Sequence, residues 1–457
     1  MSGPNSAVGA STVVVVGGGL AGITAAIGLA ERGTRVTVLE ARPRLGGATY
    51  SFQRDSLTAD TGQHVLLRCY SRYQELLGRL GALDRIAIQD RLDVPVLTPS
   101  HPPTRLRRGL HGPAPLHLLP ALARYRALPA ADRARAVLAA RALRAVDPDD
   151  PANDGVTFGA WLRRHGQTPA AVDRLWGLLC IAALNIVPDQ ASLALAARVF
   201  RTGLLDEVRA GDVGVPRVPL SRLHDGPARA AFARLGIGLH TGERVRGISG
   251  SGSGVSVRTD SGEVEADAVV LAVPHAAAAR LAPPSAVPDQ RWDELGDAAI
   301  LNVHVLYDRP VTTLPLAAVL DAGSWWVFDR TEAAGATRGQ YLVSSLSAAD
   351  EQIGTPTEEI RTRHLAALAS VFPGARSASV VDSFVTREPR ATFRQGAGTG
   401  ALRPPAATRW PRLVLAGAWT ATGWPDTMEG AVRSGLAAVE ALDTSLKSRA
   451  MTREVIA

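Results

Sequence analysis

The stretch "STVVVVGGGLAGITAAIGLAERGTRVTVLEARPRLGG", residues 11–47, decides the fold. It opens on four consecutive valines, a pattern typical of a strand that is buried on both faces. The motif G-x-G-x-x-G follows at Gly17, Gly19 and Gly22, and after it come an apolar helical segment and a second apolar strand that ends at Glu40. The stretch therefore predicts a β-α-β unit with a glycine-rich first turn.

Each glycine of this turn has a physical reason. Gly17 permits the tight turn, Gly19 lets the backbone come close to a pyrophosphate, and Gly22 lets the helix pack closely against the strand. The helix N-terminus offers free N–H groups and the positive end of its dipole to phosphates. Glu40 lies where a carboxylate binds ribose hydroxyls. We therefore expect a dinucleotide-binding site here rather than a purely structural turn.

Composition narrows the class of protein further. The chain has 457 residues, 46% of them hydrophobic and 20% charged, which is typical of a globular protein with two or three domains. Two cysteines, Cys69 and Cys180, give neither a disulfide framework nor a metal-binding spacing, so we expect no metal site and a cytoplasmic location. The net charge of +7 comes from scattered arginines without interleaved aromatic residues, so we expect no nucleic-acid partner.

The residues after the second strand carry a resemblance to a known family. "EARPRLGG" places Arg42, Arg44 and residues 46–47 directly after that strand. An arginine makes charge-assisted contacts to a pyrophosphate, and paired glycines let the chain pass close beneath an extended cofactor. This arrangement resembles the flavin-containing amine oxidase and carotenoid desaturase superfamily, which implies bound FAD in an extended form. Ala48 and Thr49 depart from the pattern, because many members have a further arginine or serine there.

A second glycine-rich stretch, "LVLAGAWTATGWPDTMEGAVRSG" at residues 413–435, predicts a strand, a turn and a helix. The resemblance implies that this segment returns to hold the flavin half of the cofactor. The N-terminus of a helix that begins at Met428 would stabilise the negative charge of a reduced flavin. Ala418 stands after Gly417, where many members have an aspartate that binds the ribityl chain, so one contact to the cofactor is expected to be lost.

The resemblance also implies the fold class and the site. We expect an α/β fold with a discontinuous Rossmann-type FAD-binding domain and an α+β substrate domain that has a mixed sheet with helices. The first domain is expected at residues 10–74, 206–284 and 396–445, and the second at residues 75–205 and 285–395. The implied cofactor-binding residues are Gly17, Gly19, Leu20, Ala21, Gly22, Glu40, Ala41, Arg42, Arg44, Gly46, Gly47, Ala48, Gly62, Gln63, His64, Val245, Gly417, Ala418, Thr427 and Met428.

Three stretches, "DTGQHVLL", "LCIAALNIVPDQAS" and "GAWTATGWPDTMEGAVRSG", resemble more narrowly the squalene-associated FAD-dependent desaturases, the hydroxysqualene dehydroxylases. This branch implies reduction of hydroxysqualene, a C30 isoprenoid alcohol, to squalene in hopanoid or triterpenoid synthesis, with NAD(P)H as a possible external reductant. The candidate proton donors are His64, Asp426 and Glu429, each of which can equally be structural. His64 is expected to donate to a flavin oxygen, to reach substrate, or only to fix its turn.

Two other classes stay open. The first is an oxidative polyisoprenoid desaturase or amine oxidase, and the second is a non-catalytic isoprenoid-binding protein on the same fold. Amine oxidases often use a lysine-bound water beside the flavin, so the presence of a single lysine, Lys447, disfavours that version. Residues 101–146 carry nine arginines and one acid, Asp132, among Leu, Ala and Pro. They predict either helices that contact the inner face of the cell membrane peripherally or a solvated helix pair over the core.

Overall fold

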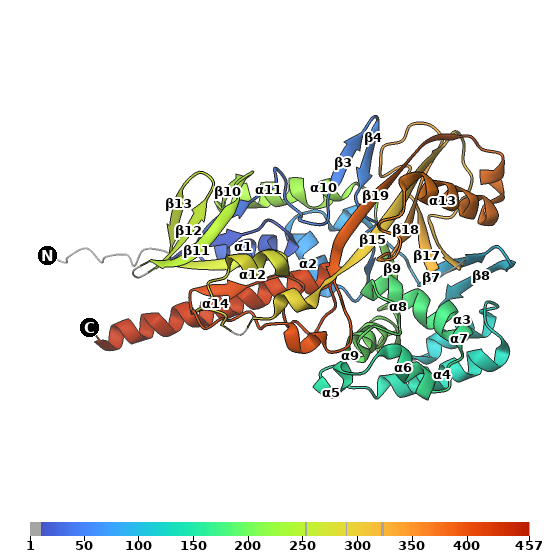
Figure 1. Ribbon diagram of the computed structural model, residues 1–457, viewed down its shortest axis with the longest axis horizontal. Coiled ribbons are helices and arrows are strands. Elements are labelled where there is room, and N and C mark those ends of the chain that lie inside the picture. The colour runs from blue at the N-terminus through green and yellow to red at the C-terminus, as the bar shows by residue number, and fades with distance from the viewer. Residues whose placement is uncertain (1–10, 252–253, 289, 321–323, 457) are drawn as a thin grey trace.

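The computed structural model describes residues 11–251, 254–288, 290–320 and 324–456, with side chains up to residue 444. The domain boundary expected at residue 10 therefore lies outside the described residues. Two large sheets organise the molecule, one of five strands and one of seven, and they lie next to each other along its long axis (Figure 1).

The five-stranded sheet is parallel and has the order β10-β2-β1-β14-β20. Its strands are β1 (Thr12–Val16), β2 (Arg35–Glu40), β10 (Gly238–Thr241), β14 (Ala268–Leu271) and β20 (Leu413–Leu415). Val16 pairs with both Leu39 and Leu271, and Leu271 pairs with Leu415, so these four strands end at one edge of the sheet. The glycine-rich turn and the C-terminal glycine-rich segment both follow that edge, where ligands bind in open parallel sheets.

Two helices cover one face of this sheet. They are α1 (Leu20–Ala30) and α14 (Met428–Ile456), which pack side by side although their sequences are far apart (Figure 1). Their shared core includes Ile23, Ile27 and Val439, all almost fully buried. The start of α14 agrees with the sequence prediction. Helix α1 begins at Leu20, because Gly19 has the extended backbone of an N-cap.

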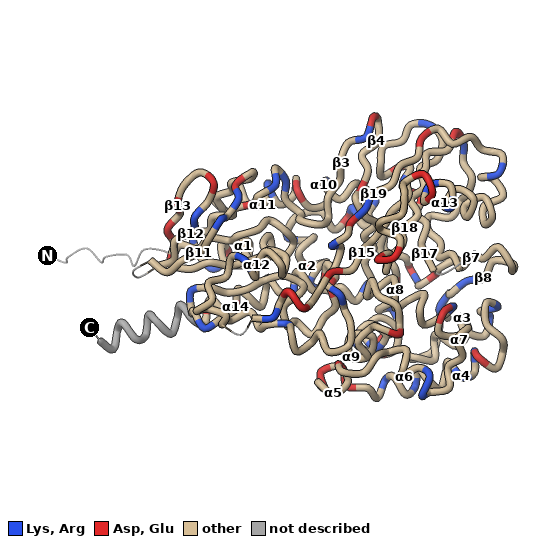
Figure 2. The backbone as a smooth tube through the Cα atoms, in the orientation of Figure 1, with Lys and Arg blue, Asp and Glu red and all other residues tan. Residues whose placement is uncertain are grey.

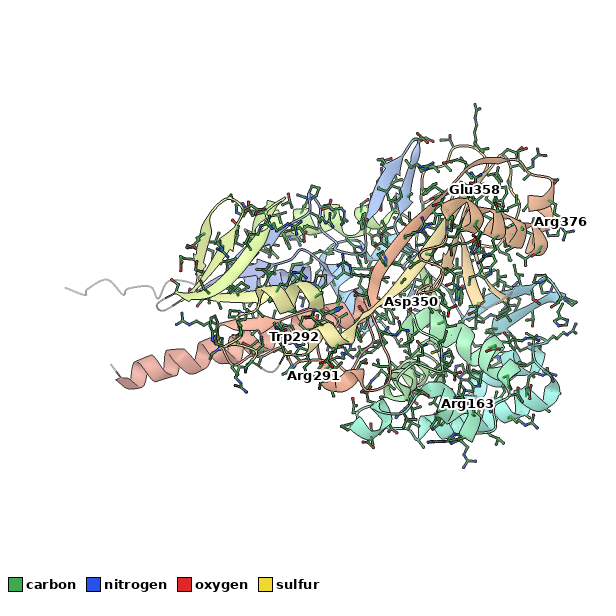
Figure 3. The ribbon with its side chains drawn as sticks, in the orientation of Figure 1. Arg163, Arg291, Trp292, Asp350, Glu358 and Arg376 are labelled. Atoms are coloured by element: carbon green, nitrogen blue, oxygen red, sulfur yellow. The ribbon has the colours of Figure 1, made fainter. Side chains whose placement is uncertain are left out.

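The opposite face of the sheet is closed by smaller elements. They are the antiparallel sheet of β11 (Val245–Ser251), β12 (Gly254–Thr259) and β13 (Glu263–Ala266), with α12 (His275–Leu281) and η5 (Trp292–Leu295). Trp292, labelled in Figure 3, is buried with its ring centroid 4.9 Å from that of Trp419 in the C-terminal glycine-rich segment. This pair packs the start of the seven-stranded sheet against the end of the five-stranded one.

The seven-stranded sheet has the order β19-β15-β18-β17-β16-β7-β8 and is antiparallel except between β16 and β7. Its strands are β7 (Asp93–Thr98), β8 (His101–Arg107), β15 (Asp297–Tyr307), β16 (Leu316–Leu320), β17 (Ser324–Asp329), β18 (Gln340–Leu346) and β19 (Val380–Phe393). The mixed sheet was predicted, but a helix over the start of 101–146 was wrong, because residues 101–107 pair with β7 and alternate exposed and buried side chains from residue 103 onward.

Helices cover both faces of this second sheet. One face packs on a helical lobe, and α13 (Thr357–Val371) packs on the other. The lobe consists of η2 (Leu116–Leu118), α3 (Leu119–Arg124), α4 (Ala130–Arg144), α5 (Pro151–Asp154), α6 (Phe158–Arg164), α7 (Pro169–Ala171), η3 (Val172–Trp176), α8 (Gly177–Leu184), α9 (Leu193–Phe200) and η4 (Arg201–Leu205). Residues 169–184 form a continuous helical stretch with one wider π-helical turn at η3.

Smaller elements join the two sheets. They are β3 (Ser51–Arg54), β4 (Leu57–Asp60), β5 (Leu66–Leu67), α2 (Ser71–Arg79), η1 (Leu83–Arg85), β6 (Ile86–Ile88), β9 (Val213–Pro216), α10 (Leu220–Leu223), α11 (Asp225–Leu235), η6 (Pro373–Arg376) and η7 (Thr399–Leu402). The five-stranded sheet takes strands from all three segments predicted for the FAD-binding domain, and the seven-stranded sheet from both segments predicted for the substrate domain. The boundaries themselves stay a prediction.

Candidate active site

The glycine-rich turn leaves room for an anionic group above Gly19. A Cβ on Gly22 would overlap the carbonyl oxygen of Gly17, and a Cβ on Gly17, whose φ is +106°, would overlap that of Ala272. A Cβ on Gly19, in contrast, would meet no atom nearer than the Gly47 Cα at 3.8 Å. Helix α1 begins there, and no side chain caps its N-terminus. The first N–H groups of the helix therefore remain available to a phosphate.

Glu40 is fixed beside this turn. Its Oε2 accepts the Gly18 N–H at 2.6 Å, and its Oε1 accepts the Arg42 N–H at 2.7 Å. Each carboxylate oxygen keeps a second lone pair, which can accept a ribose hydroxyl. The paired glycines run alongside the turn, since the Gly46 N–H donates to the Gly18 carbonyl at 2.8 Å. The residues present therefore fit the adenosine diphosphate half of FAD.

Helix α14 presents its N-terminus to the same site. The Thr427 Oγ1 accepts the Gly430 N–H at 3.1 Å, and the Thr427 carbonyl accepts the Ala431 N–H at 2.9 Å, so Thr427 is the N-cap. The N–H groups of Met428 and Glu429 consequently have no partner within the helix. The positive end of the α14 dipole thus lies where the flavin half of the cofactor was predicted.

One cavity of about 750 Å³ joins these segments to the helical lobe. Nine of the predicted cofactor-binding residues line it, together with Asp426. The nine are Gly19, Leu20, Gly46, Ala48, Gly62, Gln63, His64, Thr427 and Met428. The Gln63 Nε2 is buried and has no hydrogen-bond partner among the described residues, so a donor is left for a bound group. The cavity therefore fits the flavin half of FAD as well.

The other predicted cofactor-binding residues do not border the cavity. Gly17, Ala21, Gly22, Glu40, Ala41, Arg42, Arg44 and Gly47 belong to the turn and the segment beside it. Val245, Gly417 and Ala418 lie elsewhere along the sheet edge, and their contact with cofactor stays a prediction.

The turn around Ala418 is held by Arg403. The buried Arg403 guanidinium donates from Nη2 to the carbonyls of Ala418, Thr420 and Trp424, at 2.9, 2.6 and 2.7 Å. Burial lowers the pKa of Arg403 to about 10, so it stays charged at neutral pH. The sequence pattern gave no sign of this contact, because Arg403 lies before strand β20.

Asp426 is a carboxyl group with its accessible surface on the cavity. Its Oδ2 accepts the Phe393 N–H at 2.9 Å, and protein surrounds it on the remaining sides. Burial raises the pKa of Asp426 to about 6, although the Phe393 N–H and the Arg403 charge both act in the opposite direction. A carboxyl group of this kind can deliver a proton near neutral pH.

Glu388 is a second carboxyl in the cavity lining, and it was missed from the sequence. It lies on β19 between Arg387 and Pro389, where its neighbours suggest an exposed strand edge. Pairing with Ile300 of β15 places it in the lining. Burial raises its pKa, and the charge of Arg44 lowers it. Local sequence held no signal for this position, since the pairing of β19 with β15 creates it.

His64 lines the cavity, as predicted, and its imidazole ring is neutral there. Burial lowers its pKa, so the ring is neutral near pH 7. Its Nδ1 lies 3.2 Å from the Gly62 carbonyl oxygen, which can only accept, so the proton is assigned to Nδ1. In this tautomer the Nε2 is an acceptor, and the roles predicted for His64, donation to a flavin oxygen among them, stay predictions.

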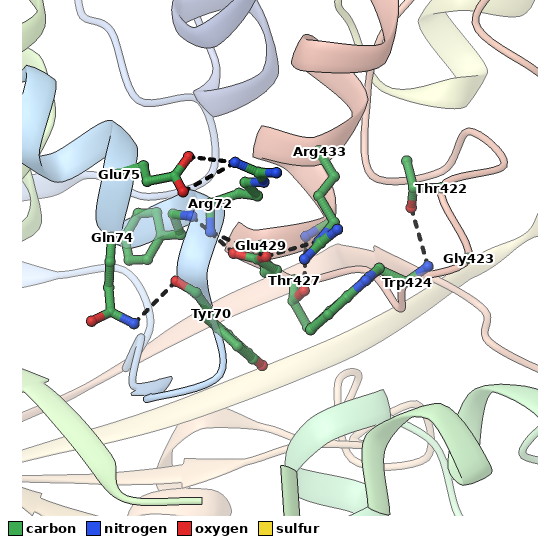
Figure 4. A network of polar contacts seen from close by, with 12 residues as sticks. Tyr70, Arg72, Gln74, Glu75, Thr422, Gly423, Trp424, Thr427, Glu429 and Arg433 are labelled. Carbon is green, nitrogen blue, oxygen red and sulfur yellow. Dashed lines mark hydrogen bonds and ion pairs between the residues drawn. The ribbon is translucent and has the colours of Figure 1, made fainter. Parts of the chain in front are cut away.

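Glu429 does not line the cavity. Figure 4 shows it between α2 and α14. Its Oε2 accepts the Tyr73 N–H at 2.8 Å, and its Oε1 accepts the Arg72 N–H at 3.3 Å and the Arg433 Nε–H at 2.8 Å. The prediction of Glu429 as a proton donor is therefore corrected. The buried carboxylate caps the start of α2 and ties it to α14.

The remainder of the cavity is mostly apolar, with Arg141 and Arg144 of α4 and Arg390 of β19 among its lining residues. Its walls come from β7, β8, β16 and β17 on one side and from η2, α3, α4, α8, α9 and η4 on the other. The lining includes Leu92, Val94, Leu106, Leu118, Leu122, Leu175, Leu179, Phe200, Leu204, Trp326 and Phe328. Such a cavity can enclose a long hydrocarbon and exclude water from the polar end that Asp426 and Thr427 form.

Known sequences resemble the chain along most of its length. Residues 20–443 match the family of flavin containing amine oxidoreductases. A hydroxysqualene dehydroxylase of Rhodopseudomonas palustris is 31% identical over 441 residues, which cover 93% of this chain and 96% of the relative. A protein with the same name from Zymomonas mobilis is 28% identical, with coverages of 94% and 98%. A zeta-carotene desaturase of Capsicum annuum is 27% identical, with coverages of 93% and 79%.

Solved structures share the fold. Putrescine oxidase bound to putrescine superposes with a TM-score of 0.69 at 21% identity, covering 96% of this chain and 99% of its own. Cyclohexylamine oxidase from Brevibacterium oxydans gives 0.68 at 19% identity, with coverages of 96% and 100%. These superpositions confirm the predicted α/β fold class, and the family match and the curated relatives confirm the predicted enzyme class. The chain belongs to the flavin containing amine oxidoreductase family and is an FAD-dependent oxidoreductase.

Proposed function

We propose that this enzyme reduces hydroxysqualene to squalene in triterpenoid synthesis, of which hopanoid synthesis is one form. The observation that carries the proposal is the cavity, which is apolar along the helical lobe and has Asp426 and Thr427 at the end where FAD fits. Hydroxysqualene has a matching distribution of polarity, since it is a long hydrocarbon with a single hydroxyl group. The relatives named hydroxysqualene dehydroxylase support the same reaction.

The reaction has a simple balance. The allylic C–O bond breaks, a C–H bond forms at the same carbon, one proton is consumed and water leaves. The turn at Gly19 and the N-terminus of α14 would hold FAD, whose reduced form would supply the hydride and the two electrons that the reaction needs. A nicotinamide cofactor, NAD(P)H, is the proposed external reductant that restores the reduced state.

Asp426 is the proposed proton donor. A hydroxyl group is a poor leaving group and needs protonation before the C–O bond breaks. Burial raises the pKa of Asp426 to about 6, so part of the population carries a proton near neutral pH, and the carboxyl group borders the cavity. The apolar walls exclude water, which would otherwise attack the allylic cation and re-form the alcohol. Glu388 is proposed to shape the polarity of this end without giving the proton.

A single-turnover experiment tests the reaction. The holoenzyme is reduced anaerobically and mixed with hydroxysqualene, and the extracted lipid is analysed by mass spectrometry. We expect squalene, lighter than the substrate by one oxygen atom, with one deuterium when the reduction and the reaction are carried out in deuterium oxide, because the N5 hydrogen of a reduced flavin exchanges with solvent. Unchanged alcohol with fully bound, reduced flavin would contradict the proposal.

The desaturase relatives favour a second candidate, an oxidative reaction on a polyisoprenoid. Here the flavin would accept hydride from the lipid and pass electrons to oxygen or a quinone. Incubation of the oxidised holoenzyme with squalene and a quinone separates the two candidates. A more unsaturated polyene would support desaturation and contradict the reductive reaction.

A cytoplasmic location with peripheral contact to the inner face of the membrane is proposed for either lipid substrate. Among the described residues, no helix is long and apolar enough to span a bilayer.

A further inference from the structure

A cluster of aliphatic side chains is exposed on the helical lobe. The described part of the chain has nine exposed large hydrophobic side chains, and five of them fall within residues 110–138. We name these five the 110–138 patch: Leu110, Leu116, Leu119, Val137 and Leu138. Leu110 and Leu138 are the most exposed, at 66% and 67%. Exposed aliphatic residues gathered in this way are typical of an interaction site.

Three residues of the patch border the cavity, which defines the mouth of the cavity on this surface. Leu116, Leu119 and Val137 are exposed and also line the cavity, so its apolar wall continues onto the surface. On α4 the exposed face carries Val137 and Leu138, while Ala136 and Ala139 are buried against the lobe. Figure 1 shows α3 and α4 at the end of the molecule remote from the five-stranded sheet. A hydrocarbon leaving the mouth would therefore meet whatever covers the patch.

The charge around the patch indicates what covers it. Five of the nine arginines in residues 101–146 pair with carboxylates of the molecule: Arg105, Arg107, Arg108, Arg135 and Arg144. The other four, Arg124, Arg126, Arg133 and Arg141, have no carboxylate within ion-pair distance among the residues that the structure describes, and all but Arg133 are exposed. Figure 2 shows basic positions around α3 and α4, with acidic positions also near these helices.

This combination matches the surface of an anionic bilayer. Exposed leucines enter the boundary between headgroups and acyl chains, and arginines beside them bind lipid phosphates. A protein partner would need an apolar surface with acidic groups that pair with these arginines. A second copy of this chain does not present such a surface through the same patch, because Asp132 is buried and already pairs with Arg135.

We propose that the 110–138 patch docks on the surface of an anionic phospholipid bilayer, and that the cavity mouth within it takes its isoprenoid substrate directly from that bilayer. The second part rests on the proposed function, whereas the docking does not. Leu110 and Leu138 act as anchors without lining the cavity, and Arg124 and Arg126 contribute the attraction to phosphate.

Vesicle flotation tests the docking. The holoenzyme is mixed with vesicles of phosphatidylcholine alone or with phosphatidylglycerol added, and the bound fraction is measured. We expect binding to the anionic vesicles, a partition coefficient at least about tenfold lower for the double variant L110E/L138E, and about fivefold lower for each of R124Q and R126Q. The matched control is V381E, since Val381 is 62% exposed but lies on β19 outside the patch.

Different failures of this experiment have different meanings. Absence of wild-type binding to anionic vesicles, or equal binding of L110E/L138E and the wild type, would overturn the docking. A dimer that L110E/L138E converts to monomer in sedimentation, without vesicle binding, would assign the patch to a second copy and overturn it too.

A kinetic comparison tests entry from the bilayer. With substrate in anionic vesicles, kcat/KM of L110E/L138E should fall about tenfold, and with substrate in detergent micelles it should match the wild type. An equal loss in both media would overturn direct entry. If the wild type binds vesicles but forms no squalene in either medium, the proposed function fails and the docking stands.

Discussion

Two carboxyl groups, Asp426 and Glu388, border one apolar cavity, and their surroundings give them different chemistry. The Asp426 side chain is enclosed by protein apart from the cavity, and its pKa rises to about 6 through burial. Burial also raises the pKa of Glu388, but the nearby positive charge of Arg44 opposes the shift. The structure therefore favours Asp426 as the group that holds a transferable proton.

Replacing Asp426 by Asn should remove the proton donor while keeping the shape of the side chain. We expect kcat for alcohol reduction to fall at least about 100-fold in D426N, because general acid catalysis contributes that much to such reactions. The E388Q variant is the matched control and should change kcat by less than about threefold. The measurement is anaerobic product formation with the bound flavin quantified by absorbance.

The pH dependence gives an independent check on this residue. The reaction needs the protonated carboxyl, which predominates below its raised pKa of about 6, so kcat should fall as pH rises through that value. D426N should lose this limb. A wild-type profile that is flat between pH 5 and 8, about one unit below and two above that pKa, would remove Asp426 as the donor.

At the scale of elements, two glycines in the first turn have separate tasks. Gly22 allows α1 to pack on β1, because a Cβ there would overlap the Gly17 carbonyl oxygen. Gly19 faces open space, because the atom nearest to a Cβ added there would be the Gly47 Cα at 3.8 Å. Packing and cofactor binding can therefore be separated by substitution within one short turn.

Alanine substitutions at these two glycines should change different properties: apoprotein stability in G22A and FAD affinity in G19A. G22A should lower the free energy of unfolding of the apoprotein by about 1–3 kcal/mol, because overpacking displaces the helix. G19A should leave that free energy almost unchanged and raise the Kd of FAD at least about tenfold, because its methyl group enters the phosphate space. Urea unfolding and FAD titration distinguish them, and loss of apoprotein stability in G19A would contradict this assignment.

At the scale of the whole molecule, FAD is predicted to join segments from both ends of the chain. The turn after β1 and the N-terminus of α14 follow the same edge of the five-stranded sheet, yet they are separated by about four hundred residues. A ligand that binds both segments only in the folded state stabilises that state by mass action.

Removal of FAD should therefore lower the thermal stability of the protein. At a free concentration one hundred times the Kd, FAD should add about 2.7 kcal/mol to the free energy of unfolding. Thermal unfolding of the apoprotein with FAD, FMN or ADP measures the effect, and each half-molecule should give a smaller increase in Tm than FAD. If FMN alone reproduces the full increase, the turn at Gly19 does not hold the adenosine half.

The sequence by itself determined the elements that depend on short-range geometry. The β-α-β unit, the returning strand and the start of α14 were predicted, because valine runs, glycines that permit close packing and helix termini act within a few residues of one another. The arginines of residues 101–146, set among Leu, Ala and Pro, were also visible in the sequence, although β8 was mistaken for part of a helix and the exposure of the leucines came only from the structure.

Only the tertiary structure decided which side chains face the cavity. Glu388 borders it because β19 pairs with β15, and Glu429 is withdrawn from it because α2 lies against α14. The raised pKa of Asp426 and the neutral state of His64 arise from desolvation by segments distant in the chain. Desolvation, strand register and cavity shape depend on how remote segments pack together, and no local pattern of residues encodes that packing.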